Sequence, residues 1–245
     1  MPCDKPQLYR QDLAYIHATA YEGLARGAAP EIIQRLRAAT IPIRRVIDVG
    51  CGAGPLSEAL IDAGFEVTGI DSSDELLTIA RKSVPSATFV HGSIYDAEMP
   101  ACDAVIALGE PLTYHTDNLD ADDRIGDLFQ RVSAVLPAGG LFIFDLIELG
   151  EPLLTARSWN SGEDWAVLVE TTENQSARRL TRNIEIFRRH GELYRRGTEV
   201  HHVRLFDTRA ITEQLIACGF AVETAQAYGE QRLPPRRRAF FTRRC

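Results

Sequence analysis

Three closely spaced glycines follow an apolar run, an arrangement suited to binding a nucleotide-like ligand. Gly50, Gly52 and Gly54 come directly after Val46–Val49 and before a helical pattern. Glycine lets a ligand approach the main chain closely, and the amide groups that begin the following helix attract a carboxylate or a phosphate. A dinucleotide turn requires G-x-G-x-x-G, whose third glycine falls at Pro55. The spacing therefore disfavours NAD.

Two acidic residues are placed to serve the same ligand. Asp71 follows the apolar run 66–70, and a carboxylate at this strand end can accept hydrogen bonds from both ribose hydroxyls of a nucleoside. NAD enzymes also carry an acid here, so Asp71 alone does not separate the two ligand classes. Asp48 lies inside the first strand, where it either orients the glycine loop or contacts the ligand; both interpretations stay open.

The pattern Asp-x-Gly-x-Gly-x-Gly over 48–54 resembles the first motif of class I S-adenosylmethionine-dependent methyltransferases, and the whole chain resembles small-molecule enzymes of bacteria. The resemblance covers about residues 45–147 and resumes at 207. It implies S-adenosylmethionine as the cofactor. Ser93 stands where the family usually carries an aspartate near the adenine. The cofactor-binding residues that the resemblance implies are Gly50, Cys51, Gly52, Gly54, Asp71, Ser72, Ser93, Ile94, Leu108 and Gly109.

Residues of a second group are placed to meet the methyl acceptor. Glu110, Tyr114 and His115 follow the fourth strand, where ligands of open α/β sheets bind, although a solvated loop is the alternative. Tyr15, His17 and Tyr21 belong to the N-terminal segment, where they either pack between helices or form a lid over the cofactor. His201 lies in a Glu-x-His-x-x-Arg-x-Phe pattern that resembles relatives, and a structural role is its alternative.

Methyl transfer requires mainly that nucleophile, methyl carbon and sulfur be held in line. A general base assists when the acceptor is a hydroxyl or a protonated amine, and a histidine with a near-neutral pKa suits that task. The catalytic candidates are therefore His17, His115 and His201, without a ranking. The substrate-binding candidates are Tyr15, Tyr21, Glu110 and Tyr114.

The elements that must position these residues alternate between strand and helix patterns. Apolar runs at 45–49, 66–70, 88–90, 104–108 and 141–144 are typical of buried parallel strands, and 56–63, 73–82 and 123–136 have helical spacing. Such a series predicts an α/β fold with a Rossmann-like, doubly wound, seven-stranded sheet. The last strands, at 221–227 and 239–243, follow a helix at 208–218, and a C-terminal strand is expected to run antiparallel.

The remaining segments predict one methyltransferase domain over 1–245 with two additions. A helical arm over 1–40 is expected to lie at the sheet edge, with Pro30 in a first helical turn and Ser72 capping the helix at 73–82. Alternating patterns at 165–173, 180–188 and 200–206 predict an inserted antiparallel β lobe over 150–206, after the fifth strand. Its arginines, from 178 to 196, are interpreted as a solvated face, with an anionic acceptor as the alternative.

Composition narrows the function classes. The net charge of −7 disfavours a nucleic-acid partner, and the segment after the fourth strand reads Gly-Glu-Pro-Leu in place of the Asn/Asp-Pro-Pro-Tyr/Phe of nucleic-acid methyltransferases. Five scattered cysteines predict neither a disulfide framework nor a metal site. No stretch is long and apolar enough to predict a membrane span or a signal peptide. We therefore expect a cytoplasmic enzyme.

The predicted function is S-adenosylmethionine-dependent methyl transfer to a small-molecule acceptor through an N or O nucleophile. Two alternatives stay open. The first is a protein methyltransferase, because an acidic chain does not exclude a protein acceptor. The second is a noncatalytic module that binds S-adenosylmethionine, which binding without turnover would reveal. The sequence carries no signal of oligomeric state.

Overall fold

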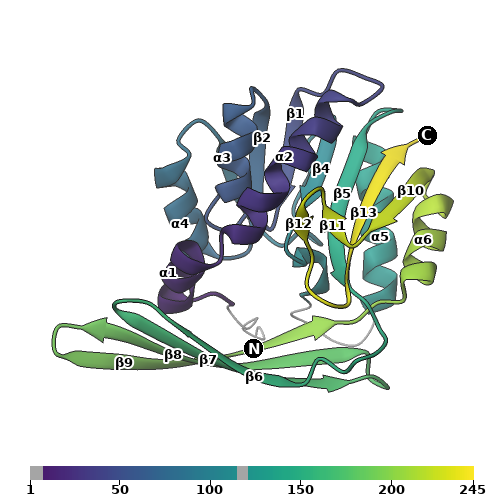
Figure 1. Cartoon of the computed structure of the whole chain (residues 1–245). Helices are drawn as coiled ribbons and strands as arrows, with labels where there is room; N and C mark the ends of the chain where they lie inside the picture. Colours follow the sequence, from purple (N-terminus) through teal and green to yellow (C-terminus); the bar gives the residue numbers. More distant parts are fainter. Residues whose placement is uncertain (1–7, 115–120) are drawn as a thin grey trace, which may run out of the picture.

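The computed structural model describes residues 8–114 and 121–245, and His115 lies outside them. A seven-stranded sheet forms the centre of the molecule (Figure 1), with strand order β3-β2-β1-β4-β5-β13-β10. The first five strands are parallel, and β13 pairs antiparallel with both β5 and β10. The strands are β1 (Arg45–Val49), β2 (Glu66–Asp71), β3 (Thr88–His91), β4 (Ala104–Ala107), β5 (Leu141–Ile147), β10 (Phe220–Ala225) and β13 (Arg237–Arg244). The predicted Rossmann-like sheet with its antiparallel C-terminal strand is confirmed.

Helices cover both faces of this sheet because its central strands are apolar on both sides. On one face, α2 and α3 pack over Val46 and Ile106, and on the other α5 and α6 pack over Ile47 and Val105. A short 3₁₀ helix, η1, follows β4. The helices are α1 (Gln11–Ala20), α2 (Gly23–Arg37), α3 (Pro55–Asp62), α4 (Asp74–Ser83), η1 (Pro111–Thr113), α5 (Ala121–Val135) and α6 (Thr208–Ala217).

The N-terminal arm differs from its prediction in position and in detail. Its helix α2 lies across a sheet face rather than at the edge, because Ile32 and Leu36 form an apolar stripe that packs on the strands. Pro30 lies inside α2, which begins seven residues earlier at Gly23. The cap of α4 is Ser73 and not Ser72, since the Ser73 hydroxyl accepts the amide of Leu76 at 3.2 Å.

A second, four-stranded antiparallel sheet follows β5, as predicted, and we call it the lobe (Figure 1). Its strand β9 begins earlier than the predicted 200, and β6 was not predicted because Ala156–Ser161 is exposed throughout and has no apolar alternation. A two-stranded hairpin of β11 and β12 was also not predicted. The strands are β6 (Ala156–Ser161), β7 (Trp165–Asn174), β8 (Arg179–His190), β9 (Leu193–Arg204), β11 (Ala227–Tyr228) and β12 (Gln231–Arg232).

The lobe turns one face toward the carboxyl ends of the parallel strands. Trp165, Val167, Ile184 and Ile186 form this inner face and pack against Ile16 of α1. The register of β7, β8 and β9 places Ile184 opposite Val169 and Glu199. The inner face therefore combines apolar and charged side chains. Within the described residues, no helix has the length and apolarity needed to cross a membrane.

Candidate functional site

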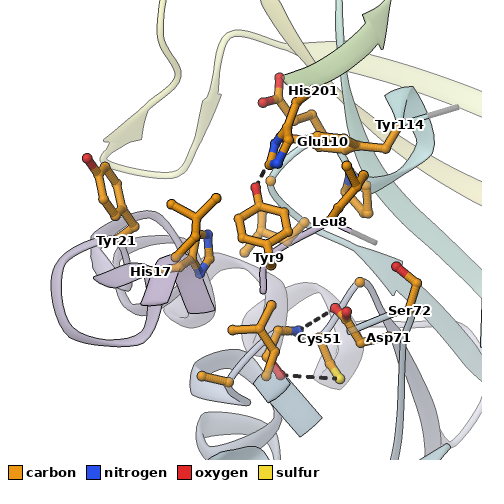
Figure 2. A pocket seen from close by; sticks show the side chains of 18 of the residues that line it. Leu8, Tyr9, His17, Tyr21, Cys51, Asp71, Ser72, Glu110, Tyr114 and His201 are labelled. Carbon is orange, nitrogen blue, oxygen red and sulfur yellow. Dashed lines mark hydrogen bonds between the residues drawn. The ribbon is translucent and has the colours of Figure 1, made fainter. Parts of the chain in front are cut away.

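A cavity of about 990 Å³ lies between the carboxyl ends of β1 to β4, helix α1 and the inner face of the lobe (Figure 2). Carboxyl ends of parallel strands are the usual ligand sites of such sheets. Most residues predicted for the site line this one cavity: Gly50, Cys51, Gly52, Asp71, Ser72, Ser93, Ile94, Leu108, Gly109, Glu110, Tyr114, His17, Tyr21 and His201.

The glycine loop after β1 provides a surface that a ligand can approach. Gly52 has φ +56°, and a Cβ built there would meet only His17 Cε1, at 4.0 Å, so the missing side chain leaves open space in the cavity. Gly50 is required for a different reason, because its Cβ would lie 2.3 Å from Pro111 Cβ. Gly54, with φ +89°, caps α3 and faces Ala80 and Val84, and it is not among the described lining residues.

Asp71 is fixed at the rim of the cavity by the same loop. Its carboxylate accepts the amide of Gly52 at 2.9 Å and the amide of Ser73 at 2.9 Å. Burial raises the pKa of Asp71, and these backbone hydrogen bonds oppose that rise. The carboxylate is therefore held in one orientation beside Ser72, which is the geometry needed to accept two neighbouring ribose hydroxyls. The open cradle at Gly52 and this fixed acid fit an adenosyl cofactor.

Asp48 orients the glycine loop through the helix that follows it. Its buried carboxylate accepts the hydroxyl of Ser57 at 2.6 Å, which joins β1 to α3. Asp48 also lines the cavity. Burial raises the pKa of Asp48 from 3.8 to about 7. A group at this pKa changes its charge near neutral pH.

The raised pKa of Asp48 predicts a pH dependence of the ligand-free protein. Because the folded-state pKa of about 7 exceeds the unfolded value of 3.8, the folded chain binds more protons between these values, and the free energy of unfolding falls as pH rises through this window. Asp48→Asn lacks this contribution. We therefore subtract the melting temperature of the native protein from that of Asp48→Asn at each pH. This difference should be more positive at pH 8 than at pH 5. An equal difference at both pH values, measured by thermal unfolding, would contradict the assignment.

One end of the cavity, at Ser93, departs from the pattern of the family that the sequence resembles. The Ser93 hydroxyl accepts the amide of Tyr95 at 3.2 Å and so begins a turn, while Ile94 is buried against the core. An acid appears three residues later, because Asp96 also lines the cavity and pairs with Arg124 at 2.8 Å. The cavity thus retains a carboxylate near this end, at a position the pattern did not indicate.

The loop after β4 carries a buried acid in an unusual backbone conformation. Gly109 has φ +86° and Glu110 has φ +64°, a region that non-glycine residues rarely adopt. The backbone N–H groups of both residues donate hydrogen bonds to the carboxylate of Asp145 in β5. The distances are 2.7 Å from Gly109 and 3.1 Å from Glu110. Asp145 is fully buried and also accepts the hydroxyl of Tyr228 at 3.2 Å. Asp145 was not predicted, because its only signal in the sequence is an acid within an apolar strand.

Two arginines hold the Glu110 carboxylate from opposite sides. Arg182 of β8 lies 2.7 Å from Oε1, and Arg237 of β13 lies 2.9 Å from Oε2. Burial opposes ionisation of Glu110, but the two arginine charges outweigh it and hold its pKa below the usual value. Arg182 also donates to the hydroxyl of Tyr114 at 2.8 Å. Arg182 thus belongs to the site rather than to a solvated face, because alternation places it on the inner side of the lobe.

Aromatic side chains occupy the middle of the cavity. Tyr9, a residue the sequence analysis missed, lies between His17 and His201 (Figure 2), with both ring centroids 5.0 Å from its own. Burial lowers the pKa of His17 to about 4, so this ring is uncharged at neutral pH. His201 is buried, and its Nε2 lies 2.8 Å from Oε2 of Glu199. Tyr21 stacks on His17 at 5.9 Å.

Besides Gly54, one described residue that was predicted for the site does not line the cavity. Tyr15 is not among the described residues that line the cavity. The guanidinium carbon of Arg188 lies over its ring, 3.7 Å from the ring centre. The Tyr15 hydroxyl lies 3.5 Å from the carboxylate of Asp164. Tyr15 thus joins α1 to the lobe. His115 falls outside the described residues, so the structure does not place it.

Comparisons with known proteins agree with this geometry. Residues 46–140 match a family model described as "Methyltransferase domain". The chain is 27% identical to "Putative methyltransferase YqeM" of Bacillus subtilis, over 86% of this chain and 87% of that protein.

Solved structures show the same fold. An S-adenosylmethionine-dependent methyltransferase from Clostridium acetobutylicum superposes with a TM-score of 0.79 at 21% identity, covering 94% of this chain and 98% of that one. S-adenosylmethionine-bound CalS10 from Micromonospora echinaspora, an amino pentose methyltransferase, has a TM-score of 0.75 at 20% identity, covering 94% and 97%. The glycine loop and Asp71 lie within the matched family segment. Residues 46–140 are therefore a methyltransferase domain, and the chain has the fold of S-adenosylmethionine-dependent methyltransferases.

Proposed function

We propose that the chain transfers a methyl group from S-adenosylmethionine to an N or O nucleophile of a small molecule. The observation that carries this proposal is that side chains of the lobe form one wall of the cavity. Val167, Val169 and Ile184 of the lobe line the same cavity as the glycine loop, so an acceptor that reaches the cofactor's methyl group would fit beneath the lobe. CalS10, which shares this fold, is named as an amino pentose methyltransferase, a small-molecule enzyme.

The cofactor end of the cavity supplies binding and orientation. Asp71 would accept the ribose hydroxyls, and the open surface at Gly52 would receive the methionine end beside His17. The uncharged state of His17 suits this place, because a cationic imidazole would repel a sulfonium. Bound S-adenosylmethionine supplies a methyl group already activated by a positive sulfur. The protein's part is then to hold the nucleophile in line with that carbon.

The acceptor end of the cavity carries balanced charge. Arg182 and Arg237 face the carboxylates of Glu110 and Asp145, with Arg237 Nε 3.5 Å from Asp145 Oδ2. This balance favours an uncharged acceptor over the anionic acceptor that the arginines first suggested. Glu110 Oε2 lies 2.9 Å from Arg237 Nη2. Because a carboxylate oxygen has more than one lone pair, Oε2 could also accept an N–H or O–H of the nucleophile and orient it.

The candidate bases differ in their surroundings. His17 is a weak base, because burial lowers its pKa to about 4. Glu110 is also weak, because the arginine charges hold its pKa below the usual value. His201 is the remaining candidate within the described residues, since it lines the cavity and is oriented by Glu199 in the manner of a carboxylate-histidine pair. We assign His201 as the base for a hydroxyl acceptor.

A metabolite screen tests the proposed function. The protein is incubated with methyl-labelled S-adenosylmethionine and, in separate arms, a small-molecule extract, a proteome and total RNA. We expect label in the small-molecule fraction and loss of that label in Glu110→Gln, which keeps the side-chain shape but removes the charge. Label confined to protein would support the protein methyltransferase instead. Cofactor binding without turnover in every arm would favour the noncatalytic module.

A further inference from the structure

A short strap precedes α1 and crosses the cavity. We define it as Leu8, Tyr9 and Arg10. Leu8 and Tyr9 both line the cavity, and Figure 2 shows Tyr9 above the glycine loop and below His201. The helical pattern of the arm indicated Tyr15, His17 and Tyr21 and none of these three residues. The strap nevertheless makes polar contacts to the lobe, to Ser73 and to Tyr114.

On one side, the strap is held by the lobe. The buried carboxylate of Glu199 in β9 accepts the amide of Tyr9 at 2.8 Å and the amide of Arg10 at 2.9 Å. His201 Nε2 lies 2.8 Å from the same carboxylate, and Arg10 Nε lies 3.7 Å away. The two strap amides each require an acceptor, and the two oxygens of this carboxylate serve both at once. Glu199 therefore ties the strap to the lobe through the main chain.

On the other side, the strap is held by the cofactor half of the site. The Ser73 hydroxyl donates to the carbonyl oxygen of Tyr9 at 2.9 Å while accepting the amide of Leu76. The backbone N–H of Ser73 itself donates a hydrogen bond to the carboxylate of Asp71. One residue thus connects the strap to the carboxylate that we assign to the ribose. The strap bridges the two halves of the cavity through its backbone.

The side chain of Tyr9 completes this bridge. Its hydroxyl lies 3.1 Å from that of Tyr114, and burial raises its pKa well above 10, so it stays protonated. Tyr9 adopts φ +53°, the left-handed region that a bulky residue occupies only where its surroundings enforce it. Strained positions of this kind concentrate at ligand clamps and switches. The contacts to Glu199, Ser73 and Tyr114 are what enforce it here.

We propose that the strap is a latch, with Tyr9 and Glu199 as its positioning residues, and that opening it sets the rate at which the demethylated cofactor leaves. The proposal rests on cofactor binding at Asp71 and the glycine loop, and it does not depend on the identity of the acceptor. While Tyr9 is hydrogen-bonded to both the lobe and Ser73, the strap crosses the cavity between the glycine loop and the lobe. Product release then requires these hydrogen bonds to break, as lid opening limits turnover in many enzymes.

The dissociation rate of S-adenosylhomocysteine tests the latch. Glu199→Gln replaces one carboxylate oxygen with an amide group, which cannot accept a strap N–H. We expect dissociation, followed by stopped-flow displacement, to become at least about tenfold faster, as for the loss of one hydrogen bond to a charged group. Ser73→Ala tests the latch independently, because it removes the hydroxyl that donates a hydrogen bond to the main-chain carbonyl of Tyr9. Glu185→Gln is the matched control, because Glu185 lies in the same lobe and pairs with Arg196 away from the strap.

Hydrogen exchange separates a latch from a general loss of stability. In Glu199→Gln the amides of Tyr9 and Arg10 should exchange faster, while amides of β7 and β8 keep their native protection. Dissociation rates within twofold of the native value in both folded variants would overturn the latch, as would faster release accompanied by exchange throughout the lobe. Should Glu199→Gln fail to fold, Ser73→Ala decides alone. Failure of the native protein to bind S-adenosylhomocysteine would instead refute the cofactor site itself.

Discussion

Replacing Asp71 with alanine should lower the affinity for S-adenosylhomocysteine about tenfold to a hundredfold. The ribose hydroxyls lose a charged hydrogen-bond acceptor, a loss of about 1.5 to 3 kcal/mol. A second effect acts in the same direction, because the Asp71 carboxylate also accepts the amides of Gly52 and Ser73. Without it, the glycine loop loses the bond that holds its cavity-facing residue. Isothermal titration calorimetry measures the change directly.

The control for this variant is an acid of the same domain with no part in the site. Asp62→Asn fits, since Asp62 is exposed at the end of α3. It should bind S-adenosylhomocysteine with native affinity. Because Asp71→Ala also removes loop contacts, the melting temperature of the ligand-free variant must be measured alongside. A folded Asp71→Ala protein with unchanged affinity would remove this residue from the cofactor site.

The cofactor half of the site could be predicted because its signals are local in the sequence. Gly50, Gly52 and Asp71 each follow directly on a strand whose apolar character is evident, and carboxyl ends of neighbouring parallel strands meet at one edge. Position in the chain was therefore enough to place them together. Gly54 was assigned to the ligand because it shares the motif, but its missing Cβ serves contact with α4 and β3, where Ala80, Val84 and Phe89 lie.

The acceptor half could not be predicted in the same way, because long-range contacts create it. Arg182 looked like one of many lobe arginines, and only the register of β8 shows that it faces inward to Glu110. Arg237 comes from the last strand, more than a hundred residues from Glu110, and no periodicity connects them. Tyr9 precedes the first helix in a segment without a pattern. Sequence periodicity reports which face is apolar, but it does not report which distant charge a buried acid will meet.

In the N-terminal arm, tertiary packing overrides a local signal for the start of a helix. Pro30 was assigned to a first helical turn because its missing amide is tolerated there. In the structure, α2 continues through Pro30 because Ala28, Ala29 and Ile32 on either side are fully buried or nearly so against the sheet. Burial of a long apolar stripe outweighs the lost hydrogen bond. The same stripe carries the arm across the sheet face and brings His17 and Tyr21 over the glycine loop.

Replacing Asp145 with asparagine should produce the largest loss of stability among single isosteric changes in the site. Every polar partner of this carboxylate is a donor: the amides of Gly109 and Glu110, the hydroxyl of Tyr228 and the guanidinium of Arg237. An asparagine in either orientation would turn its NH₂ group toward two of them. Each buried donor left without an acceptor costs about 1 to 3 kcal/mol, so the free energy of unfolding should fall by about 2 to 6 kcal/mol. In a chain of this size, the melting temperature should drop by several degrees or more.

Tyr228→Phe provides the graded comparison for this prediction. It removes one neutral donor from the same carboxylate and leaves three in place, so its loss of stability should be only about 0.5 to 1.5 kcal/mol. The Gly109–Glu110 turn should also loosen in Asp145→Asn, because consecutive left-handed residues persist only where their surroundings fix them. Faster amide exchange at these two residues, with native exchange in β1 and β2, would show that effect. If Asp145→Asn melted within a degree or two of the native protein, Asp145 would not be what holds Glu110 between its two arginines.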